Sequence, residues 1–338
     1  MNKQAMKAVV VTEPGNTQIQ KVDVPEPGED EVLIEVGASG VCHSDVFTVE
    51  QQRPEVDLPT VPGHEAVGKI VETGSDVESW SEGDRVGVGW HGGYCGECES
   101  CRRGKLNMCS DGEISGVTRD GGHAEYMVAQ SEALAQVPDE LESVDAAPMM
   151  CAGVTTFNAL RHTDAKPGDT VAVIGVGGLG HLGVQYASES GFETIAVSTS
   201  SDKEELAAEL GADHFIDASS EGVAMRLNEL GGVDVALVTA PAAEAVEQVI
   251  PGLDTDGEVT VVGVPGNPVD VEIGHLIASR GSVSGWPSGH AKDSEDTLDF
   301  GVLRDIHTIT ETYELSEYEE AYERMMENEA RFRAVIEP

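Results

Sequence analysis

Apolar and polar residues alternate over much of the first half of the chain. Between Met6 and about Met150, short runs rich in Val and Ile, such as KAVVV, VLIEV and KIVE, are separated by Gly and Pro. A period of two residues places one face of a strand in a core and the other in solvent. The pattern predicts an antiparallel or barrel-like β domain over this region.

From about Gly168 the pattern changes to strand, Gly-rich turn and helix, repeated. The runs TVAVIG, TIAVS, DHFID, VDVALV, EVTVVG and GSVSG are short and most of them are apolar, and we interpret all six as buried strands. After the first run, apolar residues from Leu179 to Ala187 keep the i, i+3, i+4, i+7, i+8 spacing of one helical face. Alternating strands and helices predict an α/β fold with a doubly wound parallel sheet.

The last stretch, residues 289–338, contains two helical patterns, around SEDTLDFGVL and EEAYERMMENE, and ends in the strand-like run RAVIE. We expect it to pack against the first domain. A chain of 338 residues has room for about two domains, which agrees with this division.

Charge is the unusual feature of the composition. The chain has 62 Asp and Glu against 20 Lys and Arg, a formal net charge of −42. The acids are spread among apolar residues, which favours a folded protein with a carboxylate-coated surface over a disordered one. Such a surface repels nucleic acid and anionic lipid, so neither is expected as a partner. The composition resembles that of proteins from halophiles that accumulate salt.

No secretory signal is visible at the start of the chain, and no apolar run approaches the roughly 18 residues of a membrane span. We therefore expect a cytoplasmic protein. In that setting clustered cysteines indicate a metal before disulfides.

A fifteen-residue window contains the spacing Cys95-x2-Cys98-x2-Cys101-x7-Cys109. Four thiolates fill every position of a tetrahedral site, which is typical of a structural zinc. The sequence therefore predicts a structural zinc lobe over residues 91–112.

The motif GVGGLG directly follows the strand TVAVI and directly precedes the amphipathic helix. Its first glycine allows a tight turn, its second lets backbone approach a pyrophosphate, and its third lets the helix meet the strand. In this setting the motif predicts dinucleotide binding. The residues expected to bind there are Gly175, Gly177, Gly178, Leu179 and Gly180.

The end of the next strand indicates which dinucleotide is bound. An NAD site normally has Asp or Glu there, bonded to the ribose 2′-OH, but this strand ends in Ser198, Thr199 and Ser200. Asp202 is interpreted as a helix cap. Hydroxyls tolerate a 2′-phosphate and Lys203 can pair with it, so NADP is expected. NAD is the alternative, because no arginine follows.

Three further motifs lie far apart: GVCHSD at Cys42, GHE at His64 and CAGVTT at Cys151. With the four-cysteine lobe and GVGGLG, in this order, they resemble the zinc-dependent medium-chain alcohol dehydrogenases over essentially the whole chain. GVGWHGGYCGECESC and TSSDK are most similar to the cinnamyl and bacterial alcohol dehydrogenase branches, which use NADP.

The resemblance implies a GroES-like catalytic domain over residues 1–152, a Rossmann domain over 153–288, and a return to the catalytic domain over 289–338. It implies reversible hydride transfer between a primary or secondary alcohol, or its aldehyde, and NADP(H), with two zinc ions per subunit. The family forms dimers and tetramers through the edge of the Rossmann sheet, so a homo-oligomer is expected.

Site residues follow from the resemblance by position. Cys42, His64 and Cys151 would hold the catalytic zinc and leave its fourth position to water or substrate. Asp45 matches the carboxylate that orients the histidine ligand, and Glu65 matches a carboxylate beside the metal. Four positions match residues that flank the nicotinamide: Thr155, Val262, Gly263 and Val264. Three match residues that line an apolar substrate pocket: Phe47, Trp90 and Met150. Arg333 matches a late arginine near the two acids.

The proton relay departs from the family pattern. Many members carry a histidine five residues after the first ligand cysteine, where this chain has Phe47. Ser44 can serve as the inner group of a relay, because its hydroxyl both accepts and donates. The outer group is either His43, whose usual pKa is about 6.5, or water, with His43 then contacting the cofactor phosphates.

Two other readings differ in their ligands. A sugar or polyol dehydrogenase of the same superfamily often has a carboxylate in place of the third cysteine and a more polar pocket, so Cys151 and Trp90 argue against it. The intact set Cys42, His64 and Cys151 argues against a zinc-free quinone reductase or a catalytically silent relative.

The charge yields a first prediction. Repulsion among the acids destabilises the compact state until salt screens it, and the screening length falls from about 10 Å at 0.1 M to about 3 Å at 1 M. We expect the melting temperature and the activity to rise as KCl increases over that range, measured by thermal unfolding and initial rates. A flat or falling melting temperature would show that other contacts already offset the repulsion.

Overall fold

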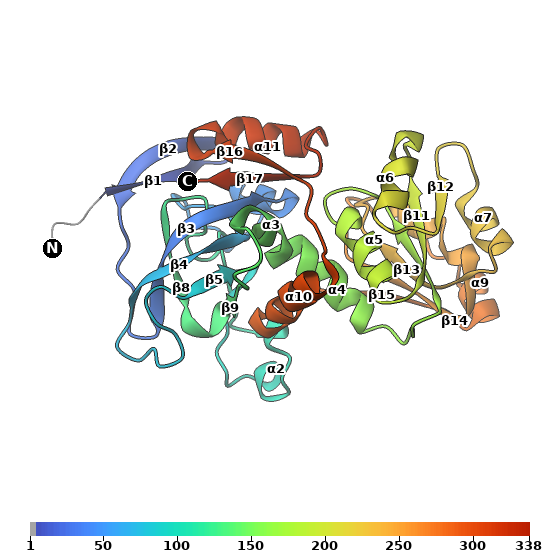
Figure 1. Ribbon diagram of the computed structural model, residues 1–338, viewed down its shortest axis with the longest axis horizontal. Coiled ribbons are helices and arrows are strands. Elements are labelled where there is room, and N and C mark those ends of the chain that lie inside the picture. Colours follow the sequence, from blue (N-terminus) through green and yellow to red (C-terminus); the bar gives the residue numbers. More distant parts are fainter. Residues whose placement is uncertain (1–4) are drawn as a thin grey trace. The chain divides into compact units, whose positions relative to one another are not determined.

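The computed structural model describes residues 5–338 (Figure 1). These residues divide into two compact units. The first unit contains the chain up to Cys151 together with Gly289–Pro338, and the second contains Ala152–Ser288. Among the described residues, no helix is both long enough and apolar enough to cross a membrane.

The second unit is built on a parallel sheet with the spatial order β12-β11-β10-β13-β14-β15. Its strands are β10 (Thr170–Ile174), β11 (Glu193–Ser198), β12 (His214–Asp217), β13 (Val233–Val238), β14 (Leu253–Val261) and β15 (Ser282–Gly285). The order reverses beside β10, and doubly wound sheets bind nucleotides at such a switch point. The doubly wound parallel sheet expected from the sequence is thereby confirmed.

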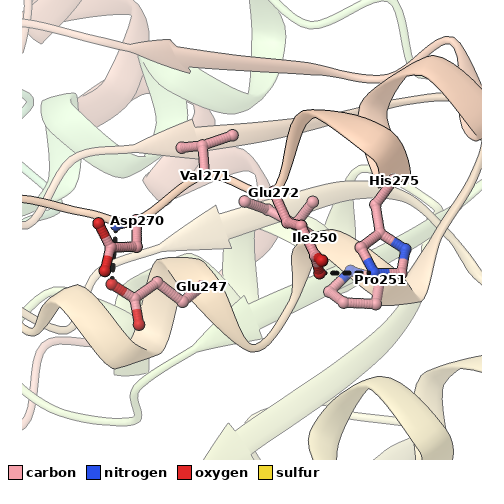
Figure 2. Close-up of a pocket in the computed structure, with 7 residues that line it drawn as sticks. All are labelled: Glu247, Ile250, Pro251, Asp270, Val271, Glu272 and His275. Carbon is pink, nitrogen blue, oxygen red and sulfur yellow. Dashed lines mark hydrogen bonds and ion pairs between the residues drawn. The ribbon is translucent and has the colours of Figure 1, made fainter.

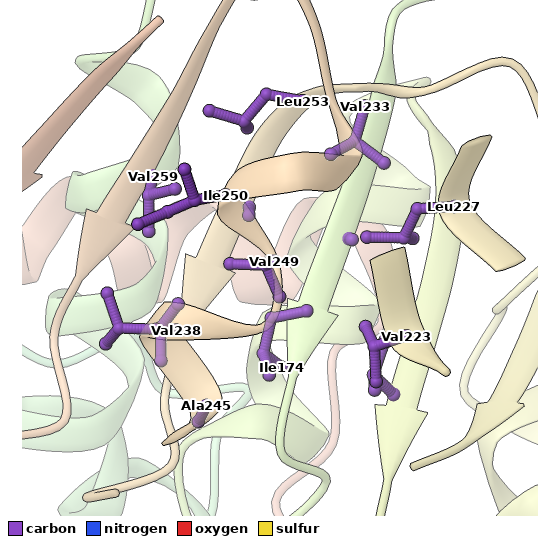
Figure 3. Packing of buried hydrophobic residues seen from close by; sticks show 14 of the residues in the cluster. Ile174, Val223, Leu227, Val233, Val238, Ala245, Val249, Ile250, Leu253 and Val259 are labelled. Atoms are coloured by element: carbon purple, nitrogen blue, oxygen red, sulfur yellow. The ribbon is translucent and has the colours of Figure 1, made fainter. Parts of the chain in front are cut away.

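Helices cover both faces of this sheet, with α5 and α6 on one side and α7 and α9 on the other (Figure 1). The helices of the unit are α4 (Val154–Arg161), α5 (Gly180–Glu189), α6 (Glu204–Glu209), α7 (Val223–Glu229), α8 (Ala243–Glu247) and α9 (Ile273–Ser279). Because both faces are covered, the central strands are apolar throughout. Figure 3 shows the core on the side of α7, where Ile174, Leu227 and Val259 are buried.

One strand differs from its prediction. The run GSVSG was expected to be buried, yet every residue of β15 is exposed. β15 pairs only with β14 among the described strands and forms the sheet edge. The local sequence alone does not distinguish an edge strand from a central one, because the tertiary fold decides which strands lie beside it.

The first unit contains a sheet of order β16-β17-β3-β4-β5-β9, with β8 also paired to β3. Its strands are β3 (Glu31–Val41), β4 (Ala66–Thr73), β5 (Arg85–Val88), β8 (Tyr126–Gln130), β9 (Leu134–Gln136), β16 (Thr310–Glu314) and β17 (Arg333–Glu337). Apart from the parallel pair β16 and β17, these strands run antiparallel to their neighbours. The C-terminal strand β17 thus lies beside β3, with Ala334 opposite Val41.

Smaller elements complete the first unit. They are the hairpin β1 (Ala5–Glu13) and β2 (Asn16–Asp23), the pair β6 (His91–Gly93) and β7 (Glu113–Ile114), and the helices α1 (Val46–Val49), α2 (Glu99–Arg102), α3 (Ser143–Pro148), α10 (Ala291–Arg304) and α11 (Tyr318–Met326). A one-turn 3-10 helix, His43–Asp45, follows β3, and a π-helix, Met149–Gly153, follows α3. Both irregular turns carry candidate site residues.

Helix α7 offers a matched test of core packing. Leu227 is fully buried, whereas Met225 on the same helix is 59% exposed. Leu227→Ala should lower the free energy of unfolding by about 2–5 kcal/mol, because it removes buried methyl groups and leaves a cavity. Met225→Ala should change it by less than about 0.5 kcal/mol. Urea unfolding at fixed salt measures both, and equal effects would contradict this description of the core.

Candidate active site

Side chains from three separate segments meet in the first unit. The ligand atoms of Cys42, His64, Glu65 and Cys151 all lie within 4.8 Å of one another. Cys42 directly follows β3, His64 and Glu65 directly precede β4, and Cys151 lies in the π-helix. Pairing of β3 with β4 brings the first two segments together. Cys42, His64 and Glu65 are buried, and Cys151 is of intermediate burial.

His64 has the arrangement of a metal-binding imidazole. Its Nδ1 lies 3.0 Å from Asp45 Oδ1, so the ring proton is assigned to Nδ1. Its buried Nε2 has no hydrogen-bond partner among residues 5–338. An unprotonated nitrogen that is buried between two thiols, without a donor, fits a zinc ligand whose other nitrogen is held by a carboxylate.

Asp45 accepts further hydrogen bonds besides the one from His64. Its Oδ2 accepts from the backbone N–H of Cys42 at 2.9 Å and lies 3.3 Å from His123 Nε2. Burial acts to raise the pKa of this carboxyl, yet His64 and His123 hold it well below its usual range. Asp45 is therefore a carboxylate at physiological pH.

Glu65 is paired with an arginine from the C-terminal strand. Arg333 Nη2 lies 2.5 and 2.6 Å from the two carboxylate oxygens and also donates to the carbonyl of Val41 at 3.3 Å. Burial raises the pKa of Glu65, and the guanidinium of Arg333 opposes that rise. A side chain at position 40 would collide with the Glu65 carboxylate, so Gly40 makes room for it. Because the oxygens of Glu65 are engaged, Cys42, His64 and Cys151 are the ligands that stay available.

Aromatic rings pack beside His64. The edge of Trp90 meets His64 with ring centroids 5.0 Å apart, and Phe47 meets Trp90 at 6.1 Å. The guanidinium of Arg53 lies 5.9 Å from the Phe47 centroid. Met150 differs from these residues, because it is 1% exposed and packs against Gly87 and Gly89 of the β5 region. It forms part of the core of the first unit, and its place in a substrate pocket stays a prediction.

His43 and Ser44 lie in the 3-10 turn between Cys42 and Asp45. His43 is exposed and Ser44 is half-buried. A half-buried hydroxyl next to an exposed imidazole is compatible with either assignment of the outer relay group.

The four-cysteine lobe has the dimensions of a tetrahedral zinc site. Cys109 Sγ lies 3.5 Å from Cys95 Sγ and 3.9 Å from Cys98 Sγ. Ligands about 2.3 Å from a central zinc are about 3.8 Å apart in a regular tetrahedron. Backbone N–H groups, that of Cys101 first, lower the pKa of the Cys98 thiol to about 6, which favours the thiolate that a metal requires.

The glycine-rich turn links β10 to the start of α5. Gly175 has φ +103°, and a side chain at Gly180 would collide with the Gly175 carbonyl. A Cβ at Gly177 would meet no described atom within 4 Å, so the backbone there is open to a ligand. Gly178 and Leu179 complete the turn before α5 begins at Gly180. The turn fits a pyrophosphate at a helix N-terminus.

The end of β11 lies beside this turn. Gly175 N–H donates to Val197 O at 2.8 Å, which places Ser198 next to the glycine turn. Lys203 donates from Nζ to Val176 O at 2.7 Å, so its ammonium group is held at the same turn. Ser200 donates its backbone N–H to Ser198 Oγ, and Thr199 lies between them.

The remaining predicted cofactor residues also lie in the second unit. Thr155, on α4, is 7% exposed, and the segment Val262, Gly263 and Val264 directly follows β14. Val262 and Gly263 donate their backbone N–H groups to Val238 O, whereas the Val264 side chain is 76% exposed. Their contact with a nicotinamide stays a prediction.

A hollow of about 430 Å³ elsewhere in the second unit contains none of these residues (Figure 2). Its acidic side chains are Glu247, Asp270 and Glu272. Glu247 accepts the backbone N–H of Asp270, and Glu272 pairs with His275 at 3.1 Å. Glu247 and Glu272 thus have partners, and the lining contains no ligand-binding motif, so the hollow carries no assigned chemistry.

Sequence reasoning missed two residues of the metal-site surroundings. His123, just before β8, and Ser39, on β3, are both fully buried and hydrogen-bonded to each other. His123 is separated from Asp45 by 78 positions. His123 falls in the region predicted to be a β domain, and no local signal connected it with GVCHSD.

Comparison with known proteins relates this arrangement to a family. Residues 28–139 match the alcohol dehydrogenase GroES-like domain, and residues 178–302 match the zinc-binding dehydrogenase family. Alcohol dehydrogenase patD of Penicillium expansum is 41% identical over 330 residues, which cover 98% of this chain and 96% of the relative.

Solved structures agree with these matches. The cinnamyl alcohol dehydrogenase SbCAD4 from Sorghum bicolor has a TM-score of 0.89 at 28% identity and covers 99% of this chain and 98% of its own. A zinc-binding dehydrogenase from Sinorhizobium meliloti bound to NADP has a TM-score of 0.88 at 28% identity, covering 99% and 100%. The combination of a GroES-like and a Rossmann domain is confirmed, and the chain belongs to the zinc-type medium-chain alcohol dehydrogenases.

Proposed function

We propose that Cys42, His64 and Cys151 hold a catalytic zinc and that the chain transfers hydride reversibly between a primary or secondary alcohol and NADP(H). The observation that carries this proposal is the buried His64 Nε2, which lies among the thiols without a partner while Nδ1 is held by Asp45. When bound, zinc supplies a Lewis acid that acidifies an alcohol and polarises an aldehyde. Three protein ligands leave a position for that substrate.

The side chains around the ligands prepare them for this chemistry. Asp45 fixes the His64 tautomer with the proton on Nδ1, so Nε2 would bind the metal, whose charge the two thiolates would offset. Arg333 pairs with Glu65 and offsets its charge, so that this carboxylate adds no net negative charge beside the metal. Trp90 and Phe47 form an apolar wall beside His64, which favours alcohols with apolar substituents over polyols.

Proton transfer to solvent is assigned to the turn after Cys42. Ser44 is the inner group, because its hydroxyl accepts one proton while it donates another. His43 is exposed and takes the outer role, with water as the alternative. This turn replaces the histidine that many family members carry at the position of Phe47.

NADP is the proposed cofactor. β11 ends in the hydroxyl of Ser198, where an NAD site normally has an acid, and Lys203 is held at the glycine turn. The Sinorhizobium meliloti relative, which is bound to NADP, supports this choice. NAD is a weaker alternative, because a hydroxyl at Ser198 also accepts a ribose 2′-OH.

The setting of the enzyme is likewise a proposal. The exposed edge strand β15, with exposed Val264 and Ile277 in the same unit, supports a homo-oligomer that pairs along this edge. Six cysteines without a disulfide support a reducing, cytoplasmic location. The charge of −42 supports adaptation to high salt.

Metal content provides the main test of the two zinc sites. The purified protein should contain two zinc ions per chain. Cys151→Ser should lose one ion and at least about 10²-fold in activity while it keeps its melting temperature, because the open site serves catalysis. Cys98→Ser should lose the other ion and melt at a lower temperature, because a closed site stores folding free energy. Full activity with one zinc or none would contradict the assignment.

Cofactor choice is tested at the end of β11. Ser198→Asp should shift the ratio of kcat/KM for NADP to that for NAD by at least about tenfold toward NAD, because a carboxylate there repels the 2′-phosphate. Ser198→Ala is the matched control, since it removes the hydroxyl without adding charge, and should keep the preference for NADP. A native enzyme that already favours NAD several-fold would show that this strand end has been misread.

A further inference from the structure

A chain of buried polar groups continues beyond the carboxylate that holds His64. Asp45 Oδ2, which accepts the Cys42 N–H, also lies 3.3 Å from His123 Nε2. On the far side of the ring, His123 Nδ1 lies 2.9 Å from Ser39 Oγ. His123 and Ser39 are fully buried, so both contacts are shielded from solvent.

The direction of these hydrogen bonds follows from their chemistry. The Asp45 carboxylate only accepts, so the His123 proton lies on Nε2. Nδ1 of the neutral ring then accepts, and the hydroxyl of Ser39 donates to it. Asp45 thereby selects the tautomer of His123, and Ser39 holds the other side of the ring by donating to Nδ1.

His123 is also tied to the segment that carries the ligand histidine. Its backbone N–H donates to Pro62 O at 3.0 Å, and Gly122 N–H donates to Gly63 O at 3.0 Å. Gly63 has φ +107°, and a Cβ there would lie 2.8 Å from the His123 ring. The residue just before His64 is therefore packed against the ring that binds Asp45.

We propose that His123, which Ser39 holds through a hydrogen bond to Nδ1, is a positioning residue for the catalytic metal site. By donating to Oδ2 it fixes the plane of the Asp45 carboxylate, so that Oδ1 meets the Nδ1 proton of His64 and Nε2 faces the two thiols. This inference rests on the proposed function, because it takes Cys42, His64 and Cys151 as the zinc ligands. It adds a step beyond the carboxylate that orients the ligand.

Packing alone is the competing explanation. The ring of His123 lies 5.1 Å from that of Tyr318 on α11, and a buried histidine also fills space. His123→Phe keeps a ring against Gly63 and Tyr318 but removes both hydrogen bonds. His123→Gln keeps an N–H near the position of Nε2. Tyr318→Phe is the matched control, because it alters the neighbouring ring only at a hydroxyl that has no partner among residues 5–338.

The experiment measures zinc release from the intact enzyme to a chromogenic chelator, together with kcat and KM at saturating zinc. The four-cysteine lobe of the same chain is the internal reference. His123→Phe should release the catalytic zinc at least about tenfold faster and lower kcat more than it changes KM, while release from the lobe stays unchanged. His123→Gln should recover most of the loss, and Tyr318→Phe should match the unsubstituted enzyme.

Ser39→Ala is the second variant and keeps the test open if His123→Phe does not fold. It leaves Nδ1 of His123 without its donor, so the ring is held less firmly against Asp45, and it should accelerate release of the catalytic zinc by less than His123→Phe does. The proposal is overturned if the His123 and Ser39 variants release that zinc at the unsubstituted rate, or if Tyr318→Phe accelerates release equally. An unsubstituted protein that binds zinc only in the lobe would instead overturn the proposed function itself.

Discussion

Asp45 is a buried carboxylate, and a carboxylate that is removed from water must be surrounded by hydrogen-bond donors. The first unit has to supply those donors. Its donors come from the turn after β3, from the loop before β4 and from the segment before β8. Each segment must therefore be held in place by the sheet before the carboxylate can be buried without a large cost in desolvation. The position and tautomer of His64 depend on this arrangement, and so does the open nitrogen that faces Cys42 and Cys151.

A second buried acid links the site to the end of the chain. Glu65 lies beside the ligands, and its countercharge, Arg333, is the first residue of β17. The antiparallel pairing of β17 with β3 sets Ala334 opposite Val41, which directs the guanidinium into the interior. The second unit is thus inserted between two parts of the chain, of which the first carries Glu65 and the second carries its counterion, Arg333.

The sequence predicts local features well and distant contacts poorly. The glycine turn and the four-cysteine lobe are recognisable because their residues fall within one short segment, whose spacing reflects the geometry directly. Cys42, His64 and Cys151 are spread over more than a hundred positions, so only a family resemblance joined them. His123 stayed unnoticed for the same reason. The exposed β15 was misjudged because the run GSVSG does not by itself show that the strand lies at an edge of the sheet.

The space at Gly40 has a consequence for how this site can change over generations. The carboxylate of Glu65 occupies the volume that any other side chain at position 40 would need, and the guanidinium of Arg333 occupies the next place inward. A methyl group at position 40 would push the Glu65 carboxylate away from its buried counterion, Arg333. A substitution at Gly40 or Arg333 is thus tolerated only after the other positions have changed. We therefore expect Gly40, Glu65 and Arg333 to evolve together as a unit.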